Sequence, residues 1–236
     1  MISTRKISAI YSKNIKSVFS NPFIAALPVM MVALAFVFRM IMPEYAAYYE
    51  IAPTLTMLVL MNVLIGGATI MAVLIAEEKE KNTLNVLITS TVSPLDFLIS
   101  HVLTAATLTI AVNVAMFYIM GVPNLPLADY LIITSIGAIA AITLGATLGL
   151  LAKNQAAAST LGTPLIAVVL LPSLFTSNFI VDNILYYFFS EQIVFALMDV
   201  IRGDGIDLLR IGIMAANFIA FAAIFAICYK KRGFAT

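Results

Sequence analysis

Charged residues are scarce in this sequence. Asp, Glu, Lys and Arg make up 11% of the 236 residues, against about a quarter in ordinary soluble domains, while 62% are hydrophobic. The single cysteine, Cys228, excludes an internal disulfide, and the chain has no Cys/His cluster that could hold zinc or iron. The net charge of +1 gives no global basic field of the kind that attracts nucleic acid. The composition therefore excludes a soluble fold.

The hydrophobic residues form uninterrupted runs, several of which reach the ~20 residues that a helix needs to cross a bilayer. These runs lack the polar alternation of transmembrane strands. They predict an all-α integral membrane protein, a single transmembrane domain over 1–236, with six spans near 23–41, 53–76, 98–120, 130–151, 157–176 and 208–229. The N-terminus has no cleavable-signal pattern, and we interpret it as mature sequence.

Basic residues predict the orientation of these spans. In the six-span topology most of them fall on the side of the two termini, and the positive-inside rule makes that side cytoplasmic. We therefore expect a multi-pass protein of the plasma membrane with both termini in the cytoplasm. The larger group is Arg5, Lys6, Lys13, Lys16, Lys79, Lys81, Lys153, Lys230, Lys231 and Arg232, and the smaller group is Arg39, Arg202 and Arg210.

Residues 1–22 precede the first span and have an amphipathic pattern. Apolar residues recur at helical spacing, whereas the basic residues fall mostly elsewhere around the helix. The pattern predicts a helix lying on the inner leaflet, which Asn21-Pro22 ends; a plain basic topology anchor is the alternative. The apolar set is Ile7, Ile10, Tyr11, Ile15, Val18 and Phe19.

Three later segments carry further structural signals. Small residues in the fourth span recur every fourth position and predict a close helix contact: Gly137, Ala141, Gly145 and Gly149. Pro164 and Pro172 predict a kinked or broken fifth span. Residues 177–207 are too apolar for a solvated loop, so we expect one or two short helices dipping into the outer leaflet and ending at Gly203-Asp204-Gly205.

The cytoplasmic segment 77–97 is the most informative part of the chain. Glu77 and Lys81 stand at i and i+4 in the favourable order, so the second span is expected to continue as a solvated helix to about Asn82. Beyond it, Leu84, Leu87 and Ile88 give a short helix an apolar face that a protein partner would cover. Ser93-Pro94 with Asp96 resembles a capping box that starts the third span.

This segment resembles the signature of export-type (type-2) ABC transporter permeases. The run Ala76-Glu77-Glu78-Lys79-Glu80-Lys81-Asn82-Thr83-Leu84, with Val86-Leu87 and then Val92-Ser93-Pro94, is similar to the family's E-x-E-[KR]-x-x-[GN]-T-[LM] motif. The resemblance implies an elbow helix at the N-terminus, six spans and a coupling helix over 83–89 that docks on a separate ATPase, with Glu77 to Lys81 anchoring its approach.

The resemblance also implies partners and cofactors. Two copies of a cytosolic ATPase would supply ATP and Mg²⁺ binding, because this chain has no G-x-x-x-x-G-K-[ST] loop and no cofactor of its own. A second permease chain, identical or a close paralogue, would complete the pathway, with the first and fifth spans lining the interface between the two. Only about a dozen residues, 41–52, separate the first two spans, whereas many relatives carry a large extracellular domain there.

Competing functions remain at this stage. An ion-coupled secondary transporter would usually need ionisable residues deep in its spans, but Arg39 and His101 lie near span ends, where we expect interfacial placement. No catalytic constellation indicates a membrane enzyme, and a structural scaffold explains neither the charged segment nor the broken fifth span.

An uncharged interior favours an amphipathic peptide, a peptide antibiotic or a lipid-like molecule as the cargo. Export of a peptide antibiotic would give the protein a role in antimicrobial resistance. A small drug or a glycolipid is the alternative. Candidate pathway residues are Asn62, Thr107, Asn113, Pro164 and Pro172, with interhelical hydrogen bonding as the alternative role of the polar ones.

Overall fold

The computed structural model describes residues 3–42, 51–81, 94–162, 164 and 185–232 of the chain. These residues are 90% helical and include no strand, which confirms the all-α prediction. Most of the predicted span 157–176 lies outside them, although residues 155–162 are helical. Five described segments are long and apolar enough to cross a membrane: Pro22–Ile41, Ile51–Glu80, Asp96–Met120, Leu127–Leu151 and Leu208–Tyr229.

The N-terminal segment forms two helices joined by a sharp turn. α1 (Thr4–Ser20) ends at Asn21, and α2 (Pro22–Ile41) begins directly after it. The Asn21 side-chain oxygen accepts the backbone N–H groups of the two residues after Pro22, at 3.1 and 3.5 Å. Pro22 has no N–H to satisfy at this first helical position. The predicted break at Asn21-Pro22 is therefore confirmed.

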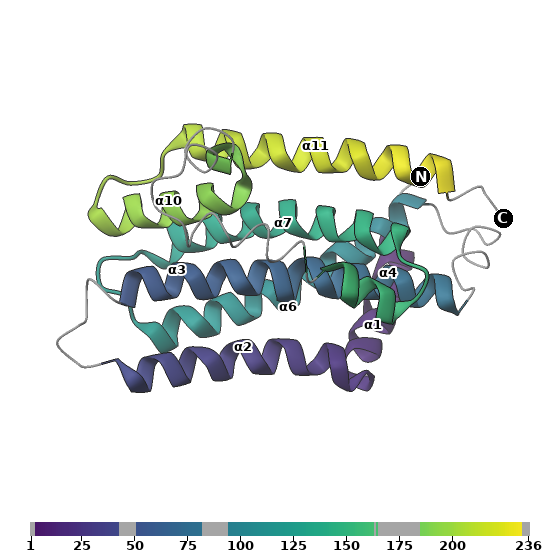
Figure 1. Cartoon of the computed structure of the whole chain (residues 1–236), viewed down its shortest axis with the longest axis horizontal. Helices are drawn as coiled ribbons and strands as arrows, with labels where there is room; N and C mark the ends of the chain where they lie inside the picture. The colour runs from purple at the N-terminus through teal and green to yellow at the C-terminus, as the bar shows by residue number, and fades with distance from the viewer. Residues whose placement is uncertain (1–2, 43–50, 82–93, 163, 165–184, 233–236) are drawn as a thin grey trace.

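α1 lies against α6 (Pro94–Met120) at one end of the bundle (Figure 1). Of the predicted apolar face, Ile10 and Val18 are buried, Ile7, Tyr11 and Ile15 are half-buried, and Phe19 is 68% exposed. The buried stripe also contains Asn14, which the sequence analysis did not single out although it falls one helical turn from both Ile10 and Val18.

The second span combines three segments, α3 (Ile51–Met61), η2 (Asn62–Thr69) and α4 (Ile70–Glu80). The sequence predicts a helical span here, and within that span η2 is a π-helix. A Cβ atom at Gly66 would lie 2.5 Å from Asn62 Oδ1, so a larger residue there would have to displace that amide. The Thr69 hydroxyl donates to the carbonyl of Leu64, five residues earlier, at 3.3 Å. Both contacts fit a wider helical turn.

α7 (Leu127–Leu151) occupies the centre of the bundle and packs against the second span, α6, α10 and α11. Its small residues permit these contacts. A Cβ atom at Gly145 would lie 2.1 Å from the Ala68 carbonyl oxygen, and one at Gly149 would lie 2.7 Å from that of Ala72. Gly137 lies against Ile193 of α10, and Ala141 is fully buried. The stripe thus faces the second span along one half and α10 along the other.

The segment before the last span is helical, as η3 (Leu185–Tyr187) and α10 (Phe189–Arg202). α10 lies at the end of the bundle opposite α1 and packs on α3, α7 and α11 (Leu208–Arg232), as Figure 1 shows. Gly203 ends α10 with a φ of 95°, a left-handed conformation that glycine adopts without strain. The predicted helix before the last span and its glycine stop are confirmed, while residues 177–184 lie outside the described part.

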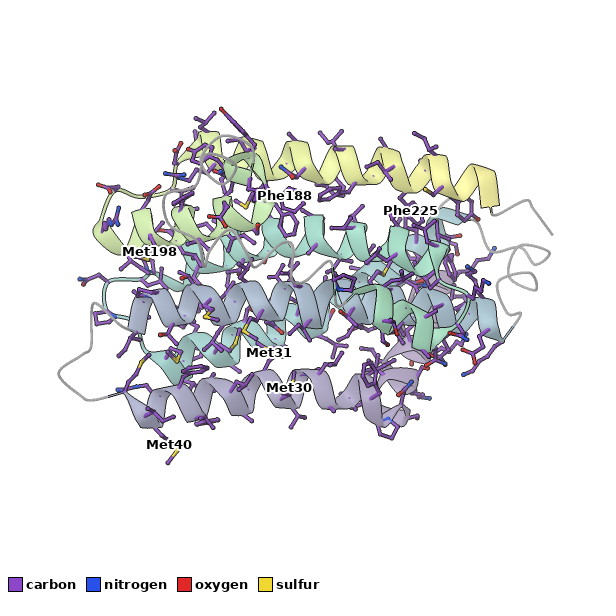
Figure 2. All side chains as sticks on the ribbon, viewed as in Figure 1. Met30, Met31, Met40, Phe188, Met198 and Phe225 are labelled. Carbon is purple, nitrogen blue, oxygen red and sulfur yellow. The ribbon has the colours of Figure 1, made fainter. Side chains whose placement is uncertain are left out.

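The outer faces of α2 and α11 expose large apolar side chains. Figure 2 shows Met40 projecting away from the bundle, where it is 85% exposed, whereas Met31 on the same helix is fully buried. Apolar side chains on the outside and closed backbone hydrogen bonds within each helix are what a hydrocarbon solvent requires. The core lies around α7 and the second span.

Candidate functional site

The charged run at the end of α4 is the centre of the candidate site. Successive side chains of an α-helix point about 100° apart, so consecutive charged residues reach in different directions. In this run each of four neighbouring residues, Glu77, Glu78, Lys79 and Glu80, contacts a segment other than its own helix. The end of the second span is therefore tied to three surrounding elements.

The two carboxylates Glu77 and Glu78 hold α1. The Ser17 hydroxyl donates to Glu77 Oε1 at 2.8 Å, and Lys13 Nζ lies 2.5 Å from Glu78 Oε1. Both glutamates are buried, at 7% and 5% exposure, whereas the Lys13 side chain is half exposed. A buried carboxylate requires charged or hydrogen-bonding partners. The elbow-like helix supplies them here.

Lys79 and Glu80, the next residues of the run, bond to the end of α7 and to the helix that follows it. Lys79 Nζ donates to the carbonyls of Leu150 and Ala152 at 2.7 and 2.5 Å, where it complements the negative end of the α7 dipole. The Glu80 carboxylate accepts the backbone N–H of Gln155 at 3.2 Å, at the start of the helix 155–162. The run thereby joins α1, α7 and this helix.

Lys81 closes the run by pairing with Glu77 in the predicted i, i+4 arrangement. The hydrogen bond and charge of Glu77, with smaller contributions from the charges of Glu78 and Glu80, raise the pKa of Lys81. Lys81 caps the helix, close to the expected end at Asn82. The other predicted coupling residues, Asn82, Thr83, Leu84, Leu87 and Ile88, lie outside the described residues.

Sequence reasoning missed several contacts of this site. Asp96 accepts the backbone N–H of Ser3 at 2.9 Å and so joins the beginnings of α1 and α6. His101 is fully buried, with its Nδ1 atom 2.8 Å from the Phe97 carbonyl oxygen, so its ring is enclosed by protein. It lies seven residues into the 27-residue helix α6, which packs against α1.

The predicted pathway residues do not share one location. Asn62 Nδ2 donates to Asn113 Oδ1 at 2.8 Å and to the Thr109 carbonyl at 3.0 Å, and all three residues are buried. Tyr130 on α7 donates to the Asn113 carbonyl at 3.0 Å. These bonds fasten the second, third and fourth spans together. Asn62 Oδ1 and Asn113 Nδ2 keep no partner among the described residues.

Thr107 and the two prolines lie elsewhere. Thr107 is exposed on the side of α6 that faces α1, where its hydroxyl donates to the Leu103 carbonyl at 2.8 Å and lies 3.4 Å from the Tyr11 hydroxyl. The expectation that it faces the bundle interior is wrong, because helical spacing turns it away from Thr109 and Asn113. Pro164 is exposed, and Pro172 is outside the described residues.

The ion pair between α1 and α4 yields a first prediction. Reversing one charge in Lys13→Glu places two carboxylates together beside a buried site, so we expect α1 to loosen from α4. A cysteine introduced as Val18→Cys, in a chain with Cys228→Ser, reports the change because Val18 is fully buried. Its labelling by a thiol reagent should increase severalfold in Lys13→Glu and return towards the original rate in Lys13→Glu with Glu78→Lys.

A matched control comes from the same helix. Lys16→Glu makes the same charge change on the exposed face of α1. Exposed charges contribute about 1 kcal/mol or less, so the labelling rate should stay near its original value. Equal labelling in Lys13→Glu and Lys16→Glu would show that the pair does not hold α1.

These helices define a multi-pass membrane protein whose charged cluster lies at one end of the bundle. A model of the ABC-2 family transporter proteins matches residues 41–227, most of the chain. The chain therefore belongs to the ABC-2 transporter family, and the resemblance of its charged motif is confirmed at the level of the family. A comparison with functionally characterised proteins gives no match. Family membership makes the chain a membrane permease subunit of a transporter.

Proposed function

We propose that this permease is the membrane subunit of an ATP-driven exporter whose separate cytosolic ATPase docks on the segment after Lys81. The observation that supports this most directly is that Glu77 to Glu80 bond to three surrounding elements. The segment 82–93 follows directly from the end of α4, which is bonded to α1, α7 and the helix 155–162. A displacement of that segment would therefore reach several spans together. ATP and Mg²⁺ would bind to the ATPase, and this chain would need no cofactor.

The position of the charged run also supports an orientation. α1, the charged end of α4 and the last turn of α11 lie at the same end of the bundle (Figure 1). The basic residues of the larger group are concentrated on these three segments. We therefore propose that the protein lies in the plasma membrane, with this end of the bundle and both termini on the cytoplasmic side. α10 would then lie at the outer surface.

Two permease chains, identical or closely related, would form the pathway with two ATPase subunits. One chain supplies too few spans to enclose an amphipathic molecule together with its own packed core, and closed pairs are the commonest assembly of such subunits. We expect the first and fifth spans to meet the second chain. The large exposed apolar side chains of α2 are consistent with such a contact or with lipid.

The cargo proposed is an amphipathic peptide, a peptide antibiotic or a lipid-like molecule that leaves the inner leaflet outward. Along the middle of the described spans the buried polar side chains are uncharged, as in Thr56, Asn62, Thr69, Thr109, Asn113, Thr134 and Thr143. The buried carboxylates and histidine of these spans, Glu77, Glu78, Asp96 and His101, lie nearer the α1 end of the bundle. Ion-coupled transport usually relies on ionisable groups at that depth. A small drug or a glycolipid is the second candidate, supported by the same uncharged interior.

Deletion of the gene tests the cargo. We expect the deleted strain to become more sensitive to at least one membrane-active peptide, or to retain such a peptide inside, because outward movement would be lost. Growth inhibition across a broad panel of peptides and drugs measures this, with the wild-type gene restored as the control. Unchanged sensitivity and unchanged secretion across the panel would contradict the proposed cargo class while leaving the family membership intact.

A further inference from the structure

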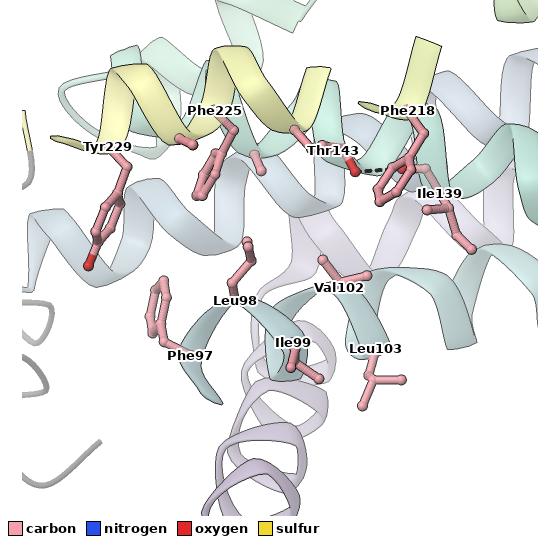
Figure 3. A pocket seen from close by; sticks show the side chains of 13 residues that line it. Phe97, Leu98, Ile99, Val102, Leu103, Ile139, Thr143, Phe218, Phe225 and Tyr229 are labelled. Atoms are coloured by element: carbon pink, nitrogen blue, oxygen red, sulfur yellow. Dashed lines mark hydrogen bonds between the residues drawn. The ribbon is translucent and has the colours of Figure 1, made fainter. Parts of the chain in front are cut away.

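An apolar groove runs between α6 and α11 and is floored by α7, as Figure 3 shows. It has a volume of about 500 Å³ and is lined by side chains such as Phe97, Val102, Phe218, Phe225 and Tyr229. The Thr143 hydroxyl in its wall already donates to the Ile139 carbonyl at 2.8 Å. The groove thus has the size of a small-molecule site and offers an apolar lining with little hydrogen-bonding capacity.

The surroundings of the groove decide what can fill it. All three helices that form it are membrane spans, and its rim residues Leu103 and Phe218 are 45% and 37% exposed, so it opens to the side. Water would find few hydrogen-bond partners in such a lining. A flexible hydrocarbon chain from the surrounding bilayer matches both the lining and the lateral opening.

Basic residues occur in the sequences of two helices near this end of the groove. The Ser3 N–H donates to the carboxylate of Asp96, which precedes the groove residue Phe97, and Arg5 and Lys6 follow Ser3 in the first turn of α1. On the other wall α11 continues from Tyr229 to Arg232, and its sequence there is Lys230-Lys231-Arg232. Clusters of basic residues directly beyond the cytoplasmic end of a span attract anionic lipid headgroups.

We propose that the groove is a binding site for a resident anionic phospholipid of the leaflet at the α1 end of the bundle. One acyl chain lies between α6 and α11 along Phe97, Phe218 and Phe225. The phosphate lies near the basic residues that begin α1 and end α11. This lipid is a bound component of the permease and differs from the exported cargo, so the inference stands even if the proposed cargo is wrong.

The absence of tryptophan from the sequence makes a direct test possible. Phe225→Trp introduces one fluorophore into the groove, and the full-length permease is reconstituted into phosphatidylcholine vesicles with brominated phosphatidylglycerol as a minor component. Bromine quenches tryptophan only on contact, so quenching reports the lipid in the groove. We expect about threefold stronger quenching than for Ile227→Trp, which faces outward from the same helix, because basic residues enrich anionic lipid locally.

Two further variants test whether the basic residues and the groove are responsible for the stronger quenching. Replacing Lys230, Lys231 and Arg232 together by glutamine should bring the quenching of Phe225→Trp down to that of Ile227→Trp. Phe218→Trp, on the same wall and partly exposed, serves as a second reporter if Phe225→Trp does not fold. Equal quenching by brominated phosphatidylglycerol and brominated phosphatidylcholine would overturn the anionic-lipid assignment. Absence of quenching by either lipid would show that protein, such as a second copy of the chain, covers the groove.

Discussion

Replacing Leu84 and Leu87 together by alanine is expected to abolish transport while leaving membrane insertion intact. Both leucines follow the anchored end of α4 and lie outside the described residues, so their role rests on the sequence pattern and the family. If 83–89 forms the proposed cytoplasmic coupling helix, lipid would not cover this apolar pair, and the proposed ATPase groove would cover it. Truncating a buried interface anchor commonly costs about 2 kcal/mol or more, so losing two should release the ATPase.

The measurement compares ATPase co-purification and export for the wild type and the double variant. Lys153→Ala is the matched control, because it removes a charge from the connection between Ala152 and Gln155, which the charged run also contacts, and rim charges usually contribute less than buried anchors. It should cause the milder loss. Normal complex formation together with normal transport in the double variant would show that 83–89 is not the coupling segment.

Gly145→Ala is expected to disrupt the contact between α7 and the second span. The added Cβ atom would lie 2.1 Å from the Ala68 carbonyl oxygen, and backbone cannot rotate away as a flexible side chain can. The two helices must therefore separate, and overpacking of this kind costs about 1–3 kcal/mol. We expect a lower unfolding temperature in detergent and loss of transport, since the displaced helix ends in the anchored charged run.

Gly212→Ala provides the control for this substitution. It makes the same chemical change in α11, where nothing lies within 4 Å of the added atom. Because alanine favours a helix over glycine by about 1 kcal/mol, this variant should keep or raise the unfolding temperature. If both variants unfolded at the same temperature as the wild type, the close packing of α7 on the second span would be wrong.

The sequence predicted those features that depend on local patterns. Long apolar runs indicate spans because the bilayer fixes their length, and Asn21-Pro22 indicates a helix boundary because its chemistry is local. The i, i+4 pair of Glu77 and Lys81 follows from helical spacing alone. None of these predictions required knowledge of which helices are neighbours in the fold.

The rest depends on tertiary neighbours. Glu78 pairs with Lys13, 65 residues away, and Lys79 reaches the end of α7, which no local pattern specifies. The π-helix at Asn62–Thr69 and the burial of His101 likewise follow from the packing of other spans against these residues. Asn14 could have been found, because it continues the Ile10 and Val18 stripe.

Purification of the complete transporter from its own membranes tests the central proposal most directly. The mass and composition of the particle give the copy number of each chain. We predict two permease chains with two copies of a cytosolic ATPase, and a particle that loses the ATPase when the permease carries Leu84→Ala and Leu87→Ala. A particle with a single permease chain that still hydrolyses ATP in response to cargo, or a permease that exports cargo with no ATPase present, would contradict it.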